Sequence, residues 1–161
     1  MWIGVVSDTH GNEKSTTEAV HMLRQFPIER VLHCGDIGST KVVELLSEWP
    51  TDYVLGNVDD NPEVLAESIA DHGGVLHGEV ARLQITGQSI GVAHGHQRDV
   101  LQRLIDSGEF RLVCTGHTHR REVRIEESTW ILNPGALHRA RPHSLAVVDL
   151  DQWNIEILPL V

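Results

Sequence analysis

Short apolar runs that end in glycine and a polar side chain constrain the fold of this chain more than any other feature of its sequence. In the first half of the chain, these runs alternate with segments whose apolar residues recur at helical spacing. This alternation is typical of β-α-β units, which build a mostly parallel sheet with helices on its faces. An α/β fold is therefore expected.

The first half contains three predicted strands, each followed by a predicted helix. The strands cover residues 3–7, 31–34 and 53–55. The first helix is expected to begin near Asn12 and to stop before Pro27, because a proline disfavours helical backbone in the residue before it. The second is expected to begin at Ser39 or Thr40 and the third after Asn61, since Ser, Thr and Asn side chains cap helix N-termini.

The second half favours antiparallel strands, because its apolar and polar residues alternate with a period of two. A hairpin with its turn at Gly87-Gln88 is predicted, followed by a short helix over residues 100–107. Further strands are predicted at residues 112–115, 123–126, 129–132, 145–149 and 153–158. With 161 residues, of which 40% are hydrophobic, the chain has the length of one domain. We expect residues 1–161 to form a single domain of two β-rich halves with helices outside.

The net charge of −10 limits the partners that the chain is expected to bind. An acidic chain repels phosphate backbones, so general nucleic-acid binding is not expected. No apolar run approaches the ~18 residues of a membrane span, and the first residues lack the basic and cleavage signals of a secreted protein. A cytoplasmic location without a membrane partner is therefore predicted. Cys34 and Cys114 each end an apolar run, which favours buried, reduced thiols over a disulfide or a metal site.

Polar side chains cluster where the predicted strands end, and most of them are next to a glycine. The segments are Asp8-Thr9-His10-Gly11, Gly35-Asp36, Gly56-Asn57, His94-Gly95-His96 and Gly116-His117-Thr118-His119. In α/β sheets, the loops beyond the carboxyl ends of the strands converge on one crevice. Taken singly, each segment also suits a cap or a turn, but the ordered set at successive strand ends favours one shared site.

The expected metal donors in this set are two carboxylates, one amide and four imidazoles. They exceed what one tetrahedral zinc ion binds, and the mixture of oxygen and nitrogen favours Mn²⁺, Fe, Zn²⁺, Co²⁺ or Ni²⁺ over an all-oxygen Ca²⁺ site. Two cations about 3.5–4 Å apart account for the surplus of donors, provided that one carboxylate bridges them. Asp36 lies in the middle of the series and is the expected bridge.

The whole series, extended by Asp59 and by Asn133-Pro134-Gly135, resembles the motifs of the calcineurin-like metallophosphoesterase superfamily. The small size and the absence of a cap insertion make the chain similar to the single-domain phosphodiesterases of bacteria and archaea. The resemblance implies a four-layer sandwich of two packed mixed β-sheets flanked by helices. It also implies two sets of metal ligands, namely Asp8, His10, Asp36 and His119 for the first ion, and Asp36, Asn57, His94 and His117 for the second.

The resemblance further implies a metal-dependent phosphoesterase in which a hydroxide that bridges two divalent cations attacks phosphorus in line. Mn²⁺ is the first expectation for the cations, with Ni²⁺, Fe, Zn²⁺ and Co²⁺ as alternatives. Asp36 and Asn57 would serve catalysis as well as metal binding, Asn57 by stabilising charge on the phosphoryl oxygens. The open site without a cap favours small phosphodiesters as substrates. A phosphomonoesterase, a nuclease of the same fold, and a non-catalytic protein-interaction scaffold similar to the retromer subunit are the alternatives.

One position departs from the better-known phosphatases of the superfamily. The residue after the ligand Asn57 is a His in those enzymes, where it helps to protonate the leaving group, and it is Val58 here. The small phosphodiesterases commonly lack this His as well. His96 is the expected general acid in its place, with water as the alternative.

Several further polar residues have both a functional and a structural interpretation. Asn12 is predicted to offer its amide to a substrate phosphate, with plain helix capping as the alternative. Arg98, Arg139 and Arg141 would add positive charge at the mouth of the site if they are not simply exposed. His33 either hydrogen-bonds a ligand or packs in the core. The remaining histidines are expected on the surface or in the core: His21, His72, His77, His138 and His143.

Overall fold

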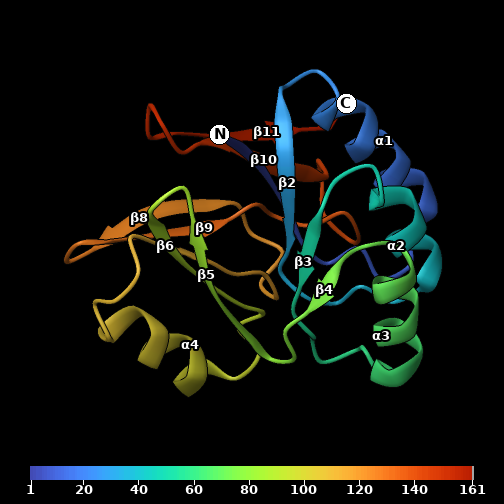
Figure 1. Cartoon of the computed structure of the whole chain (residues 1–161), viewed down its shortest axis with the longest axis horizontal. Coiled ribbons are helices and arrows are strands. Elements are labelled where there is room, and N and C mark those ends of the chain that lie inside the picture. The colour runs from blue at the N-terminus through green and yellow to red at the C-terminus, as the bar shows by residue number, and fades with distance from the viewer. Residues whose placement is uncertain (161) are drawn as a thin grey trace.

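Two mixed β-sheets pack against each other in the computed structural model, which describes residues 1–160 (Figure 1). The first sheet has six strands in the order β11-β10-β1-β2-β3-β4. Their bounds are Trp2–Val6 for β1, Ile28–His33 for β2, Thr51–Tyr53 for β3, Val75–Leu76 for β4, Ser144–Asp149 for β10 and Asn154–Pro159 for β11. Strands β1 to β4 run parallel, whereas β10 and β11 pair antiparallel with their neighbours.

The second sheet has five strands in the order β5-β6-β7-β9-β8. Their bounds are Val80–Ile85 for β5, Gln88–Ala93 for β6, Leu112–Cys114 for β7, Glu122–Glu126 for β8 and Thr129–Asn133 for β9. Strands β6, β7 and β9 are parallel, and β5 and β8 pair antiparallel at the edges. Val5 and Leu32 of the first sheet join Leu112 of the second in one buried cluster, so the main apolar contact lies between the sheets.

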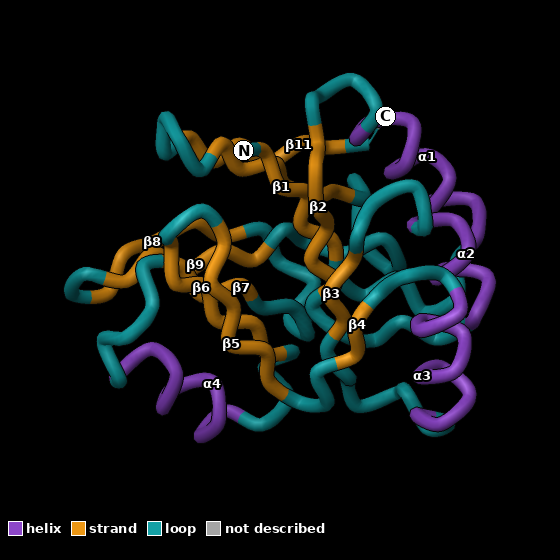
Figure 2. Tube along the Cα trace, in the orientation of Figure 1, coloured by secondary structure: helices purple, strands orange, loops and turns teal. Residues whose placement is uncertain are grey.

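Helices cover the outer face of each sheet and complete four layers (Figures 1 and 2). The first sheet carries α1 (Glu13–Leu23), α2 (Thr40–Leu46) and α3 (Pro62–Asp71), and the second carries α4 (Arg98–Asp106). The predicted α/β class and the four-layer sandwich are therefore confirmed. Among residues 1–160, no helix has the length and the apolar content that crossing a membrane requires.

The two sheets do not correspond to the two halves of the sequence, both of which contain strands. Strand β10 pairs with β1, and β11 follows it, so the last two strands return to the sheet that the first half builds. All six residues of β10 are buried, because this interior strand of the first sheet packs on α1 with one face and on the second sheet with the other. The period-two pattern predicted these strands but carries no information about their partners. The same pattern does not predict β4, which is two residues long and has an exposed Val75.

Two predicted boundaries are also corrected. The hairpin turn consists of Thr86 and Gly87, with φ of 47° and 78°, so Gln88 already belongs to β6. Two consecutive residues with positive φ are the geometry of a tight hairpin turn whose twist matches the strands. Strand β2 begins at Ile28, which pairs with Trp2, and not at Val31. Arg30 pairs with Ile3 although Arg30 is only partly buried. An apolar run therefore marks the buried part of this strand and not its full hydrogen-bonded length.

Candidate metal centre

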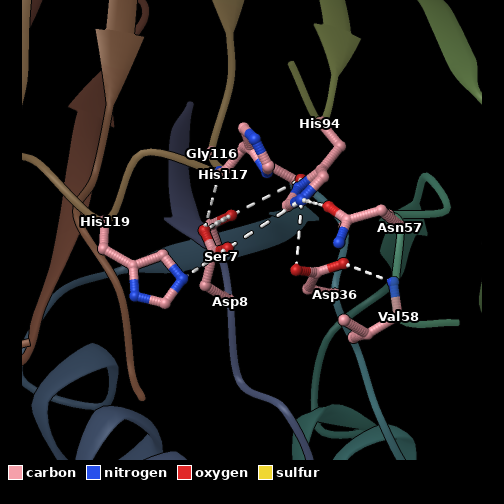
Figure 3. Close-up of polar contacts among 12 residues, drawn as sticks. Ser7, Asp8, Asp36, Asn57, Val58, His94, Gly116, His117 and His119 are labelled. Carbon is pink, nitrogen blue, oxygen red and sulfur yellow. Dashed lines mark hydrogen bonds and ion pairs between the residues drawn. The ribbon is translucent and has the colours of Figure 1, made fainter. Parts of the chain in front are cut away.

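The predicted ligands lie in loops beyond the carboxyl ends of the parallel strands, and backbone hydrogen bonds hold these loops together. Asp8 N donates to Gly35 O at 3.0 Å within the first sheet, and Gly116 N donates to His94 O at 2.9 Å within the second. His117 N donates to Oδ2 of Asp8 at 3.0 Å and so connects the two sheets (Figure 3). The site is therefore built at the common edge of both sheets, as the convergence of the strand ends predicted.

Two carboxylates and three imidazoles form the inner part of the site. Figure 3 shows Asp8, Asp36, His94 and His119 among them. Oδ2 of Asp36 lies 3.2 Å from Nε2 of His10 and 3.2 Å from Nε2 of His94. Oδ1 of Asp8 lies 3.1 Å from Nε2 of His119. Two groups are compact enough to hold an ion, namely Asp8 with His10 and His119, and Asp8 with Asp36 and His94. Asp36 thus lies between two imidazoles, and Asp8 belongs to both groups.

The orientation of His94 fits a bound cation. Its Nδ1 lies 2.8 Å from the carbonyl oxygen of Cys34, which can only accept, so Nδ1 carries the proton. In the neutral ring, Nε2 then points a lone pair at Oδ2 of Asp36, and two acceptors at this distance repel unless a cation or a proton lies between them. Oδ1 of Asp8 and Nε2 of His10 are also buried without a hydrogen-bond partner. A ligand His whose other nitrogen donates to a carbonyl is the common arrangement in metal sites.

Asn57 and His117 lie on the exposed side of this inner group. Oδ1 of Asn57 is 3.2 Å from Nε2 of His94. The ring centroid of His117 is 5.2 Å from that of His94, and its side chain stands outside the two compact donor groups. Burial, followed by the charge of His94, lowers the pKa of His117, which favours the neutral ring that metals bind. The structure therefore brings all seven predicted ligands to one place, and their role as ligands stays a prediction.

Backbone conformation aims several of these side chains into the site. The angle φ is 54° at Asp8, 46° at His10, 56° at Asp36, 66° at His117 and 58° at His119. Within residues 1–160, only nine residues other than glycine have a positive φ, so more than half of them are predicted ligands. This conformation is costly for residues with a Cβ atom, and such strain concentrates at functional sites.

Gly56 and Gly116 allow the loops to approach the carboxylates closely. A Cβ atom on Gly56 would lie 2.0 Å from Oδ1 of Asp36. A Cβ atom on Gly116 would lie 1.9 Å from Oγ of Ser7 and 2.7 Å from Oδ2 of Asp8. All three distances are below van der Waals contact, so these positions exclude any side chain unless the site shifts.

The surroundings of Asp36 keep its carboxylate ionised. Burial opposes the charge, but the hydrogen bond and charge of His94, the N–H of Val58 at 3.1 Å and the charge of His10 together lower the pKa of Asp36 to about 2. Burial of His94 opposes protonation of its ring, while Asp36 and Asp8 raise the pKa of His94 above its ordinary value. A bridging metal ligand needs an ionised carboxylate, and a bound cation would take the place of the proton between Asp36 and His94.

The structure places three residues at the centre for which no role is predicted from the sequence. Ser7 donates from Oγ to Oδ2 of Asp8 at 2.6 Å. Asp59 accepts hydrogen bonds from two loop backbone N–H groups. The ring of His138, expected on the surface or in the core, lies 4.7 Å from the ring of His10. The position of His138 three residues after Asn133-Pro134-Gly135 is the one signal in the sequence that could have indicated this, because that segment resembles a loop beside the site.

Asn12 and His33 have structural contacts. Oδ1 of Asn12 caps α1 by accepting from Ser15 N at 3.3 Å, and its Nδ2 donates to Leu137 O at 3.2 Å. These hydrogen bonds support the capping alternative for Asn12. Nε2 of His33 lies 2.9 Å from Oγ1 of Thr9, so His33 supports the loop that carries Asp8 and His10 but hydrogen-bonds neither ligand.

His96 lies at the rim of the site. Its ring centroid is 5.5 Å from that of His94 and 6.2 Å from that of His117. Nδ1 of His96 is buried without a hydrogen-bond partner. Val58, whose backbone N–H holds Asp36, offers no proton from its side chain. His96 thus lies beside the predicted ligands His94 and His117, and its role as general acid stays a prediction.

Comparisons with known proteins agree with this geometry. Phosphodiesterase MJ0936 of Methanocaldococcus jannaschii is 29% identical over 138 residues, which cover 84% of this chain and 83% of that protein. A solved archaeal phosphodiesterase has a TM-score of 0.92 at 25% identity, with 99% of this chain and 100% of that chain covered. Vps29 of Entamoeba histolytica, in a single-mutant structure, shares the fold with a TM-score of 0.72 at 20% identity over 100% of both chains.

A family model spans the whole part of the sequence that carries the predicted ligands. The model of the calcineurin-like phosphoesterase superfamily domain matches residues 1–152, a range that contains all seven predicted ligands. The structure gathers these ligands at the edge of two packed sheets, as the resemblance implied. The chain therefore belongs to the calcineurin-like phosphoesterase superfamily.

Proposed function

We propose that this chain is a metal-dependent phosphodiesterase that acts on small phosphodiesters as a single domain. The family and the relatives named as phosphodiesterases support this activity. The observation that carries the proposal is the position of Oδ2 of Asp36, at 3.2 Å from Nε2 of both His10 and His94. One carboxylate oxygen between two imidazoles aimed at it is what a ligand shared by two cations requires.

Two divalent cations are the proposed cofactors. Asp8, His10, Asp36 and His119 would hold one, and Asp36, Asn57, His94 and His117 the other. Mn²⁺ is our first choice because the donors mix carboxylate oxygen with imidazole nitrogen, and Ni²⁺, Fe, Zn²⁺ and Co²⁺ are the alternatives. When bound, such cations lower the pKa of a coordinated water to about 7 and neutralise charge on phosphoryl oxygens.

The protein's own side chains position the substrate and move protons. Asn57 is exposed beside His94, where its amide is available to a phosphoryl oxygen on which charge develops. His96 is the proposed donor of a proton to the leaving group, since its ring lies beside the rings of the predicted ligands His94 and His117. Substrates whose leaving groups need little protonation should react fastest, because they depend least on this proton donor.

The proposed substrate is a small molecule and not a nucleic acid, since the net charge of −10 disfavours a long phosphate backbone. A cytoplasmic location without a membrane partner is part of the proposal. A phosphomonoesterase or a nuclease would use the same centre and differ only in the substrate. A non-catalytic scaffold is the rival from another class, and the likeness to Vps29 concerns the fold alone.

The experiment that tests the proposal compares hydrolysis of bis-p-nitrophenyl phosphate with that of p-nitrophenyl phosphate. The protein is stripped of metal and then assayed with Mn²⁺, Ni²⁺, Zn²⁺ or Mg²⁺ added back. We expect metal-restored cleavage that is faster for the diester, with Mn²⁺ among the best cations. Faster cleavage of the monoester would favour a phosphatase. Absence of turnover by protein that binds two ions would favour the scaffold.

A further inference from the structure

Positive side chains without an acidic partner gather beside the metal centre. The chain has 13 Lys and Arg residues. Within residues 1–160, six of them make ion pairs: Arg24, Arg30, Lys41, Arg82, Arg103 and Arg124. The others are Lys14, Arg98, Arg111, Arg120, Arg121, Arg139 and Arg141. Most of these unpaired cations line two cavities, and neither cavity contains Arg98, which was expected at the mouth of the site together with Arg139 and Arg141.

The larger cavity has a volume of about 890 Å³ and is lined by Lys14, Arg139 and Arg141. Its position relative to the metal centre follows from His138, which precedes Arg139 and whose ring lies 4.7 Å from the ring of His10. The loop that carries both arginines is also tied to the start of α1 through the hydrogen bond from Asn12 to Leu137. The cavity therefore lies between the loop that follows His138 and the start of α1, where Asn12 in its lining follows the predicted ligand His10 by two residues.

The charge of this cavity is opposite to that of the protein. Glu18 is the only acidic residue in its lining, against three cations, whereas the whole chain carries −10. Arg139 and Arg141 are exposed, so their guanidinium groups are free to form paired hydrogen bonds with a phosphate. The second cavity is smaller, at about 560 Å³, and sets Arg120 and Arg121 against Glu122. The larger cavity thus has the greater excess of positive charge.

We propose that the substrate is a phosphodiester that carries a further phosphate group, and that this group binds in the cavity lined by Lys14, Arg139 and Arg141. The inference rests on the proposed function and names the substrate class for the same site. A diester has one negative charge and the metal centre is enough to attract it, so three additional unpaired cations indicate a second anionic group. The acidic remainder of the protein restricts the ligand to a small molecule such as a nucleotide derivative and disfavours a polynucleotide.

The test uses two chromogenic diesters that differ only in the additional phosphate. These are thymidine 5′-(p-nitrophenyl phosphate) and its 3′-phosphorylated form, which carries about two more negative charges. For the protein loaded with Mn²⁺, we expect kcat/KM to be at least ~10-fold higher for the 3′-phosphorylated diester, because charge-assisted hydrogen bonds to phosphate are strong. The preference should shrink as salt concentration rises. Equal or lower kcat/KM for the 3′-phosphorylated diester would overturn the inference while leaving the phosphodiesterase itself intact.

Variants locate the phosphate site. The double variant Arg139→Gln, Arg141→Gln should remove most of the preference for the 3′-phosphorylated diester, measured as the ratio of the two kcat/KM values of the same protein, because the additional phosphate loses its charge-assisted hydrogen bonds. Arg103→Gln, on the exposed face of α4, is the matched control and should retain the preference. If Arg120→Gln with Arg121→Gln removed the preference instead, the assignment to the larger cavity would be wrong.

A binding measurement decides the inference even if neither diester is cleaved. Calorimetry compares thymidine 3′,5′-bisphosphate with thymidine 5′-phosphate on the Mn²⁺-loaded protein. We expect the bisphosphate to bind about 10-fold more tightly, and the Arg139→Gln, Arg141→Gln variant to lose that difference. Tight bisphosphate binding without turnover would refute the proposed hydrolysis but keep the phosphate site. Equal binding of both nucleotides would refute the site.

Discussion

Oδ2 of Asp59 accepts a hydrogen bond from the backbone N–H of Gly56 at 2.8 Å. Its other oxygen, Oδ1, accepts from the N–H of Gly38 at 3.0 Å. The two glycines belong to the loops that carry Asn57 and Asp36, so one buried carboxylate fixes two predicted ligands relative to each other. Asp59 follows Val58, which stands where related phosphatases have a His. In this chain, the Asp59 carboxylate accepts hydrogen bonds from backbone N–H groups of the two loops.

The variant Asp59→Asn should weaken metal binding at the site of Asn57 and Asp36. An amide offers one acceptor oxygen, so one of the two N–H groups would face an NH₂ group and lose its partner. We expect metal affinity to fall by roughly 10–100-fold, as for other residues that orient ligands, and stability by about 1–3 kcal/mol. Calorimetric metal titration measures the first and urea unfolding the second. Asp60→Asn, at the exposed neighbour, is the control, and equal effects of both variants would contradict this role of Asp59.

Asp36→Asn should lower metal content and turnover together. The neutral amide cannot compensate the charge of two cations, so bound metal should fall from two ions per chain and kcat by at least ~100-fold. Elemental analysis and the diester assay measure the two effects. Cys34→Ser is the control, because the backbone carbonyl of Cys34 and not its thiol accepts from His94. Full activity of Asp36→Asn would refute the two-metal mechanism.

His33 should make the metal-free protein less stable in acid. Burial lowers the pKa of His33 to about 4, against 6.5 for a free side chain. The geometry agrees, because Nδ1 accepts from Gly35 N at 3.2 Å and protonation would break that hydrogen bond. Above pH ~6.5 neither the folded nor the unfolded state is protonated, and between ~6.5 and ~4 only the unfolded state binds the proton. The free energy of unfolding should therefore fall by about 3 kcal/mol over this interval.

Urea unfolding between pH 4 and 8 in the presence of a chelator measures this effect. His33→Gln should show a smaller dependence on pH, because the titrating group is gone. His21→Gln changes an exposed His of α1 and should keep the dependence of the parent protein. An unchanged slope in His33→Gln would mean that other groups cause the acid sensitivity.

The motif residues were predictable from the sequence. Metal binding requires Asp, Asn or His side chains, and the predicted strand ends indicate where in the fold these side chains lie. Asp8, Asp36 and His94 are each buried within three residues of the end of a strand that the apolar pattern indicates. The seven predicted ligands accordingly meet in space. Local patterns also predicted most strands and helices to within a few residues, since burial periodicity is a local property.

Long-range partners were not predictable in this way. The pairing of β10 with β1 depends on which exposed edge remains free, and no local pattern records it. The contact of His138 with His10 depends on the path of the loop between β9 and β10, which has no periodicity. The hydrogen bonds of Asp59 were not predictable either. Its partners are backbone N–H groups, which every residue except proline has, so the sequence does not single them out.

The variant Val58→His tests whether protonation of the leaving group limits the native enzyme. Its backbone N–H already holds Asp36, so the substitution changes only a partly exposed side chain beside Asn57. An added acid should raise kcat at least ~10-fold for a diester with an alkyl leaving group, such as ethyl thymidine 5′-phosphate followed by NMR, because general acids contribute about 10²–10⁴-fold in favourable sites. It should change cleavage of the p-nitrophenyl diester little, since that leaving group departs without a proton. Val75→His, at an exposed position of β4, should affect neither substrate.

The variant His96→Gln separates the remaining explanations. If Val58→His gives no gain on the alkyl diester and His96→Gln selectively slows cleavage of that diester, His96 already supplies the proton. No effect of either variant would assign the proton to water.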